Sequence, residues 1–362
     1  MSSCFNGGIT VSLFGESHGK GIGVVIDNLP AGEEIDLDKI GAFMARRAPK
    51  KDGTSTMRSE KDIPEILSGV YNGKTTGTPL SAVIFNQDQH SSDYGNISHI
   101  ARPAHADYTG YLRYNGANDP RGGGHFSGRI TAPLCFAGAV CAQILEHRGI
   151  TTGAHILSVK DVQDAAFDTM NVTAEQMNAV KARSFPVLTD KAEEEMRAII
   201  NAARVSLDSV GGVIECAAVG FPAGIGSPMM DGLENTIARL VFAVPAVKGL
   251  EFGNGFGCTR LFGSENNDPF RMDGDRVVTE TNNHGGILGG ISSGMPIIFR
   301  AAFKPTPSIS RPQMSVDFKE QTEQELVIKG RHDPCVVPRA VPCVESALNI
   351  ALVSALMDNP SI

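Results

Sequence analysis

The sequence lacks the cysteine pairs and the basic charge that mark two large classes of protein. Its seven cysteines are far apart and include no C-x-x-C pair, so neither a disulfide framework nor a zinc site is indicated. The chain has 32 lysines and arginines against 40 aspartates and glutamates, a net charge of −8. Nucleic-acid-binding domains are normally basic. We therefore expect no metal site and no nucleic-acid partner.

Long apolar runs are also absent. The longest one, residues 132–145, is shorter than the ~20 residues that a transmembrane helix needs. The first residues, "MSSCFNGG", lack the charged and apolar regions of a signal peptide. We therefore expect a cytoplasmic protein with reduced thiols and no membrane partner.

Glycine is abundant, with 40 residues, and helix and strand patterns lie between the glycines. Helical spacing predicts helices over residues 36–47, 127–148, 191–207, 232–243 and 341–357. Strand-like runs bounded by glycine lie at residues 9–15, 21–27, 79–85, 211–220 and 295–303. Helices and strands do not alternate regularly, which argues against a doubly wound sheet or a TIM barrel. The pattern favours an α+β fold with antiparallel sheets around buried helices.

Residues 15–19, Gly-Glu-Ser-His-Gly, satisfy the G-x-S-x-G pattern of the serine hydrolases. In those enzymes the serine lies on a sharp turn between a strand and a helix. Here a second strand is predicted to follow, so the context favours His18 as the functional group and Ser17 as its neighbour. A serine hydrolase is kept as the alternative from a different class.

The segment RGGGHFSGRIT, residues 121–131, predicts an anion site. Its glycines let backbone N–H groups approach a ligand, and Ser127 is a good N-cap for the helix that follows. Arg121, His125 and Arg129 add cations at the start of this helix. The segment matches neither the Walker A motif nor the dinucleotide fingerprint, so ATP and dinucleotides are not the first expectation.

Two further loops carry groups suited to binding and proton transfer. His105 lies beside Asp107, and Asp333 is flanked by Arg331 and His332. Asp333 is either a general base or part of a loop ion pair. Because arginine binds carboxylate and phosphate with two parallel hydrogen bonds, the set indicates a small polyanionic ligand and acid–base chemistry.

Six motifs, in this order, resemble those of the chorismate synthase family from about residue 7 to 356. They are FGESHG (14–19), RPAHADYT (102–109), RGGGHFSGRIT (121–131), HGGILGGISSG (284–294), FKPTPSI (303–309) and GRHDPC with RAVP (330–335 and 339–342). The resemblance implies one domain over residues 1–362, a β-α-β sandwich with buried helices between two antiparallel sheets, assembled as a homotetramer.

The resemblance also implies an activity. It is the anti-1,4-elimination of phosphate from 5-enolpyruvylshikimate 3-phosphate, which gives chorismate in the last step of the shikimate pathway. The reaction requires reduced FMN with no net redox change. Some members reduce the flavin themselves with NADPH, and others rely on an external reductant such as a separate flavin reductase.

Residue roles follow from the same resemblance. His18 supplies a proton or positive charge to the departing phosphate, His105 balances the charge of the reduced flavin near N1, and Asp333 acts with flavin N5 to accept the substrate proton. The residues that correspond to FMN contacts are His125, Phe126, Ser127, Ala246, Gly289, Lys304, Pro305, Thr306, Pro307, Ser308 and Arg331. Those that correspond to substrate or NADPH contacts are Ser17, Arg46, Arg47, Arg129 and Arg339.

The sequence departs from the family pattern at a few positions. The usual arginine-serine-serine is His-Phe-Ser at residues 125–127, Gly53 stands where many members have arginine, and Ala104 replaces a glycine. These changes leave open a second alternative, a family member that binds flavin but has lost turnover. The presence of all three acid–base candidates favours the active enzyme.

Overall fold

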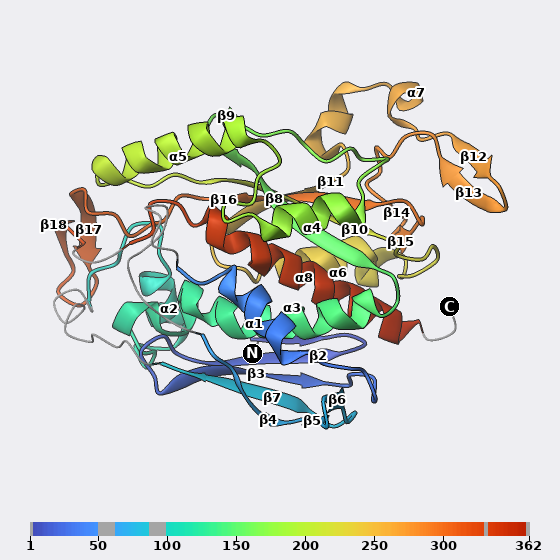
Figure 1. The fold of residues 1–362 in the computed structure, drawn as a ribbon. Coiled ribbons are helices and arrows are strands. Elements are labelled where there is room, and N and C mark those ends of the chain that lie inside the picture. Colours follow the sequence, from blue (N-terminus) through green and yellow to red (C-terminus); the bar gives the residue numbers. More distant parts are fainter. Residues whose placement is uncertain (1–2, 50–61, 87–98, 329–331, 360–362) are drawn as a thin grey trace.

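Two five-stranded antiparallel sheets form the outer layers of the protein, with helices packed between them (Figure 1). The computed structural model describes residues 3–49, 62–86, 99–328 and 332–359. The first sheet has the order β1 (Cys4–Asn6), β2 (Thr10–Gly15), β3 (Gly21–Asp27), β7 (Leu80–Phe85) and β4 (Glu65–Ser68). The second has the order β11 (Val247–Phe252), β16 (Ile297–Phe303), β10 (Gly212–Val219), β8 (Thr151–Val159) and β9 (Val162–Gln163). The predicted α+β class and the antiparallel sheets are confirmed.

The helices fall into inner and outer groups (Figure 1). The inner ones are α1 (Leu37–Ala45), α3 (Thr131–Glu146), α6 (Leu233–Val241) and α8 (Val337–Asp358). The others are α2 (Asp107–Arg113), α4 (Ala174–Ala182), α5 (Asp190–Val205) and α7 (Gly263–Asn266). The described part of the chain also has short hairpins: β5 (Val70–Tyr71) with β6 (Lys74–Thr75), β12 (Phe270–Asp273) with β13 (Arg276–Thr279), β14 (Ile287–Leu288) with β15 (Ile291–Ser292), and β17 (Gln313–Asp317) with β18 (Thr322–Leu326). Short 3-10 helices lie at Arg121–Phe126, Gly128–Ile130, Met229–Asp231 and Gly255–Arg260.

Helices α3 and α8 form the centre of the core. Both are apolar nearly all round and buried along most of their length, as predicted for α3. By length and composition the stretches Gly128–Glu146 and Val337–Asp358 could cross a membrane, but 89% of each apolar window is buried inside the protein. Their hydrophobicity is therefore accounted for by packing between the two sheets.

Helix α8 begins at Val337, earlier than the predicted start at residue 341. Pro338 lies in its first turn, where the missing N–H would have had no intrahelical partner. Pro342 lies inside the helix, at the cost of one backbone hydrogen bond. The earlier start matters because it places Arg339 and Cys343 on the helix.

The outer face of the second sheet contains a buried charged network. His155 of β8, Glu215 of β10 and Arg300 of β16 are paired across the strands. The His155 Nε2 lies 3.0 Å from Glu215 Oε2, and Arg300 Nε donates to Glu215 Oε1 at 3.0 Å. Burial opposes the charged imidazole, but hydrogen bonding to Asp164 and Glu215 outweighs burial and raises the pKa of His155.

We expect the contribution of His155 to stability to fall as the pH rises. Because the pKa of His155 is raised in the folded state, its contribution to stability is fully present below the ordinary value of 6.5. The contribution falls above 6.5 and is lost once the pH exceeds the folded-state pKa. Both carboxylates have lowered pKa values, so they stay ionised through this range. The unfolding temperature of His155→Gln should therefore lie further below that of the unmodified protein at about pH 6 than at about pH 9. An equal difference in unfolding temperature at both pH values would contradict a charged His155 in the folded protein.

Candidate active site

A cavity of about 960 Å³ opens beside the N-terminal ends of α3 and α8. Strand β2, helix α6 and the segment 304–308 supply the rest of its wall. Ligand sites range over about 300–1,000 Å³, so this one is at the upper end and has room for more than one small ligand. One part of the wall is apolar, with Leu13, Ile130, Leu134, Leu240 and Val244.

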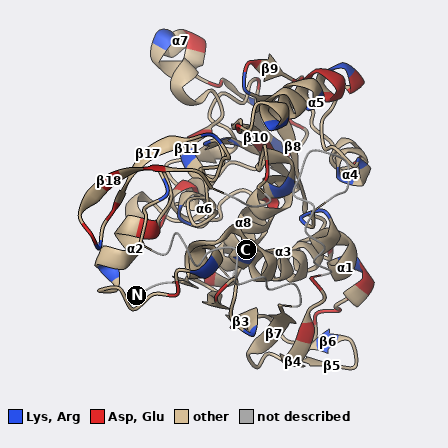
Figure 2. Cartoon of the chain, turned by 90° about the vertical axis from the view of Figure 1, so that its left-hand side faces the viewer, with Lys and Arg blue, Asp and Glu red and all other residues tan. Residues whose placement is uncertain are grey.

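The cavity concentrates positive charge in an acidic protein. The lysines and arginines in its wall are Arg47, Arg102, Arg129, Arg239, Lys304 and Arg339. Among the described residues that line it, Asp333 is the one carboxylate. Acidic side chains lie instead on the exposed faces of elements such as α1 and α5 (Figure 2). This distribution suits a ligand with several negative charges.

The three consecutive glycines 122–124 bring His18 and His105 to the same stretch of wall. All three have φ between +53° and +96°, the left-handed region that favours glycine. A Cβ on Gly122 would lie 2.1 Å from His18 Cε1, and one on Gly123 would lie 3.2 Å from His105 Nε2. Gly122 and His105 line the cavity, and the buried His18 ring lies directly behind Gly122.

Alanine at position 122 should therefore displace His18. The new Cβ would overlap the imidazole and would also require an unfavourable backbone conformation. We expect Gly122→Ala to lower turnover on the order of 10²-fold, the scale of a 1 Å misplacement of a reacting group. Gly41→Ala is the matched control, because nothing lies within 4 Å of its added Cβ. Equal turnover of the two variants would show that the glycine does not seat His18.

His105 is fixed by the two residues around it in the motif. Its Nδ1 lies 2.7 Å from Asp107 Oδ1 and 3.2 Å from an Arg102 guanidinium nitrogen. The Arg102 guanidinium group in turn donates two hydrogen bonds of 2.7 Å to Asp107, and the Arg102 backbone N–H donates a third at 3.0 Å. Despite burial, these contacts hold the pKa of Asp107 well below its ordinary value. The carboxylate therefore holds Nδ1 and leaves the Nε2 edge of the ring toward Gly123 and the cavity.

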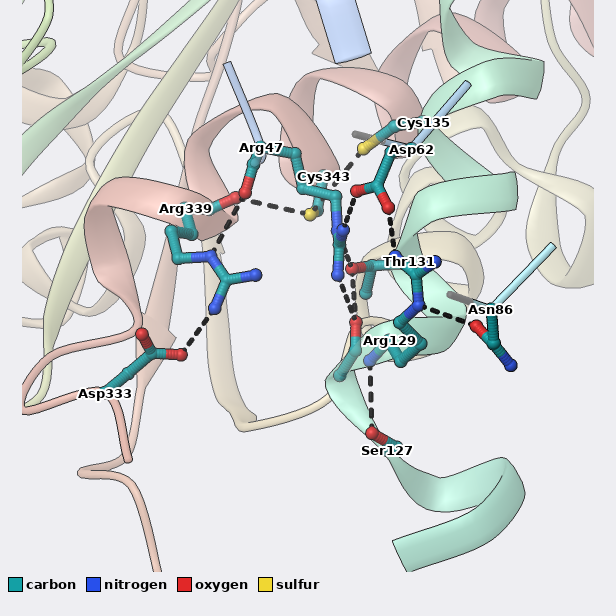
Figure 3. A network of polar contacts seen from close by, with 11 residues as sticks. Arg47, Asp62, Asn86, Ser127, Arg129, Thr131, Cys135, Asp333, Arg339 and Cys343 are labelled. Atoms are coloured by element: carbon teal, nitrogen blue, oxygen red, sulfur yellow. Dashed lines mark hydrogen bonds and ion pairs between the residues drawn. The ribbon is translucent and has the colours of Figure 1, made fainter. Parts of the chain in front are cut away.

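The two arginines predicted to bind substrate share one buried carboxylate (Figure 3). Arg47 and Arg129 each form an ion pair with Asp62, whose side chain is 1% exposed. Arg47 also donates to Thr131 Oγ1 at 2.9 Å, and Arg129 Nε donates to Asn86 Oδ1 at 3.0 Å. Both guanidinium groups are thus fixed in position, with the Asp62 carboxylate between them.

Asp333 lies at the opposite side of the same network, paired with Arg339 (Figure 3). An Arg339 guanidinium nitrogen donates to Asp333 Oδ2 at 2.6 Å, and Arg339 Nε donates to the Arg47 carbonyl oxygen at 3.1 Å. Arg339 therefore connects the candidate base to the backbone of Arg47, an arginine predicted to bind substrate. The ion pair of Asp333 is with an arginine of helix α8, and it lies in the cavity wall.

Residues 125–127, where the sequence departs from the family pattern, take different positions around the cavity. His125 Nδ1 lies 2.8 Å from the Gly15 carbonyl oxygen, and its Nε2 contacts Ser3 Oγ. Both ring nitrogens are therefore bonded to protein, and the ring ties the cavity wall to β2. Phe126 presents a partly exposed ring. Ser127 Oγ accepts from the Arg129 N–H at 3.2 Å and caps the short 3-10 helix Gly128–Ile130, which leads into α3, rather than α3 itself.

The predicted flavin segment 304–308 forms another part of the wall. Lys304 Nζ donates to the Ala104 carbonyl oxygen, which ties this segment to the loop that carries His105. Among the described residues, the buried Thr306 hydroxyl has no hydrogen-bond partner, although it lines the cavity. A buried unpaired hydroxyl is costly unless a ligand satisfies it. Pro307, Ser308 and Ala246 line the same cavity.

The remaining predicted site residues lie elsewhere. Arg46 pairs with the buried Glu345 at 2.7 Å, and Gly289 lies in the turn between β14 and β15; neither lines the cavity, nor does Pro305. Ser17 Oγ lies 3.1 Å from His18 Nδ1, in a turn between the antiparallel strands β2 and β3 and not before a helix. Arg331 and Gly53 lie outside the described residues.

Sequence patterns did not single out Asp62 or Asn86. Neither belongs to a glycine-rich or histidine-containing motif, and each reaches its arginine only in the folded chain. Arg102 and Asp107 lie within three residues of His105 in the same motif. Their contact with His105 could therefore be expected from their proximity in the sequence.

Comparisons with known proteins identify the family. The chorismate synthase family model matches residues 9–357. The chain is 44% identical to the chorismate synthase of Lancefieldella parvula, covering 100% of this chain and 98% of the relative. It is 45% identical to that of Korarchaeum cryptofilum, covering 95% and 94%. A crystal structure of a chorismate synthase superposes with a TM-score of 0.76 at 28% identity, covering 98% of this chain and 93% of that one. The chain is an enzyme of the lyase class and belongs to the chorismate synthase family.

Proposed function

We propose that the protein converts 5-enolpyruvylshikimate 3-phosphate to chorismate and phosphate by anti-1,4-elimination, with reduced FMN and no net redox change. The observation that carries this proposal is the single cation-rich cavity, which has His105 and Asp333 in its wall and His18 directly behind Gly122. Family membership supports the substrate and the flavin requirement.

The cavity fits a flavin beside an anionic ring. Its apolar wall suits the isoalloxazine faces, and the unpaired Thr306 hydroxyl and Lys304 suit the polar end of the cofactor. We propose that Ser127, Ala246 and the 304–308 segment hold FMN. Both ring nitrogens of His125 contact protein groups, the Gly15 carbonyl oxygen and the Ser3 hydroxyl. We therefore propose that His125 shapes the cavity wall and does not take the place of the family's arginine in binding a ligand phosphate.

Substrate binding falls to the arginines. Arg47 and Arg129 present fixed guanidinium groups on one side and Arg339 on another, which suits the carboxylates and phosphate of the substrate. The Asp62 carboxylate lies between the first two and fixes the position of both guanidinium groups. Fixed cations of this kind stabilise the charge that develops on a departing phosphate.

Proton movement is assigned to three side chains. Asp333, positioned by Arg339, takes up the proton that the substrate ring loses. His18 supplies a proton or positive charge to the leaving phosphate from behind Gly122. His105, oriented by Asp107, balances negative charge on the cofactor. Reduced FMN, when bound, supplies electron density to the reacting ring.

Further proposals concern the domain organisation, localisation, flavin supply and oligomeric state of the enzyme. We propose that the whole chain forms one domain, works in the cytoplasm, and obtains reduced flavin either by using NADPH itself or from a separate reductase. A homotetramer is supported by exposed aromatic side chains such as Phe256, Phe262 and Phe270, which lie together on the segment around α7 and β12.

An anaerobic assay with reduced FMN tests the proposed reaction. Phosphate release from 5-enolpyruvylshikimate 3-phosphate that depends on reduced flavin would support it. Flavin binding without phosphate release would favour the family member that has lost turnover. Ester hydrolysis abolished by Ser17→Ala would favour the serine hydrolase.

A further inference from the structure

Two buried cysteines meet at the inner end of the cavity. Cys135 on α3 and Cys343 on α8 have their Sγ atoms 3.8 Å apart (Figure 3). A disulfide has an S–S length of about 2.05 Å, so the two sulfurs need to approach by somewhat less than ~2 Å. Both thiols are free in this structure.

The helices that carry the pair are close together at this level. One turn further along both helices, Gly138 faces Ser346, and a Cβ on Gly138 would lie 2.2 Å from the Ser346 Cβ. Such contact between backbone and side chain requires a short interhelical distance. The pair therefore lies where α3 and α8 approach each other closely, which is the geometry that a disulfide between helices needs.

The two sulfurs differ in their surroundings. Cys343 lines the cavity, whereas Cys135 lies behind it and donates its S–H to Cys343 Sγ. The hydrogen bond from Cys135, together with the positive charges of Arg47 and Arg339, outweighs burial and lowers the pKa of Cys343. Thiolate character at neutral pH is what makes a cysteine react with oxidants.

Other buried cysteines lack these features. Burial raises the pKa of Cys141, Cys216 and Cys335, and none of the three lines the cavity. They are expected to be inert. Cys141 also lies on α3, which makes it a matched control for Cys135.

We propose that Cys343 and Cys135 form a reversible redox pair in which Cys343 is the reactive thiol and hydrogen peroxide the oxidant. The Cys343 thiolate attacks one peroxide oxygen; the S–O bond forms, the O–O bond breaks, and the departing hydroxide takes a proton to become water. The Cys135 sulfur then attacks the sulfenic acid; the S–S bond forms, the S–O bond breaks, and the hydroxyl leaves as water with the Cys135 proton. In sum, two thiols and one peroxide give one disulfide and two waters.

Oxidation acts on the anion site through α3. Thr131 accepts a hydrogen bond from Arg47 one turn before Cys135 on the same helix. Drawing the sulfurs together moves this helix end relative to α8, which carries Arg339. We expect oxidation to raise the KM for an anionic ligand by about tenfold and a thiol reductant to restore it.

The test treats the reduced, folded protein with hydrogen peroxide, blocks remaining thiols in acid, and maps peptides without reduction. We expect a linked Cys135–Cys343 peptide pair whose mass is lower by two hydrogens and which dithiothreitol separates. Cys141→Ser should keep the link, and Cys343→Ser should abolish it. In Cys135→Ser, dimedone should trap Cys343 as sulfenic acid, because no second thiol is available.

Absence of the linked pair, with oxidation confined to the exposed Cys258 or to Cys4, would overturn the proposal. So would a link that forms only after the protein is unfolded. The chemistry is followed by mass and needs no substrate or flavin. Its failure is therefore distinguishable from failure of the proposed enzymatic reaction.

Discussion

Replacing His18 with alanine is expected to lower turnover on the order of 10²-fold or more, the usual scale for a positioned acid–base group. The ring is buried directly behind Gly122, where it can deliver positive charge to a leaving phosphate bound in the cavity. Alanine removes that charge and leaves the arginines in place. The loss should therefore appear in kcat under anaerobic conditions with reduced FMN, with a much smaller change in KM.

Ser17→Ala is the matched control for this experiment. Its hydroxyl lies 3.1 Å from His18 Nδ1, so its removal loosens the ring without removing the imidazole. We expect a smaller loss than for His18→Ala. A loss of less than about tenfold in His18→Ala would contradict the role assigned to the imidazole. A larger effect at Ser17 than at His18 would reverse the assignment of the two residues.

The second large effect is expected at Asp62. Asp62→Asn leaves Arg47 and Arg129 buried without the carboxylate that they share. Removing one partner of a buried ion pair typically costs about 3–5 kcal/mol, so we expect a marked fall in the free energy of unfolding. Urea unfolding at neutral pH measures it. Asp161→Asn, at an exposed ion pair, should leave the free energy of unfolding nearly unchanged.

An anion should partly rescue the Asp62 variant. Inorganic phosphate bound between the two arginines would replace the missing negative charge and stabilise the folded state by mass action. We therefore expect phosphate to raise the unfolding temperature of Asp62→Asn more than that of the unmodified protein. Equal unfolding temperatures for the two proteins without phosphate would show that Asp62 does not support the arginines.

The sequence alone predicted most of the central architecture, because the relevant patterns are local. The buried helix α3 and the five predicted strands depend on spacing and glycine positions within short segments. Strand β8 was missed because it is buried at nearly every position and has no alternation of polar and apolar residues. The start of α8 was predicted four residues late, at 341 rather than Val337.

Within the site, the limits of sequence reasoning are clearest at Arg46 and Arg47. Successive residues at a helix end point about 100° apart, so two adjacent arginines cannot both face one cavity. Arg47 turns to Asp62 and the cavity, and Arg46 turns to the buried Glu345. The sequence pattern Arg-Arg alone does not predict which of the two arginines faces the cavity. Asp62 was missed because Arg129, one of the arginines that it pairs with, is distant along the chain.

Whether one cavity holds a flavin and an anionic ring together is measured most directly by titrating oxidised FMN with and without 5-enolpyruvylshikimate 3-phosphate. Ligands that stack against each other in one cavity should bind cooperatively, so FMN should bind more tightly when the substrate is present. Identical FMN affinity in both titrations would mean that the two ligands occupy independent sites, and would contradict a shared cavity around His105 and Asp333.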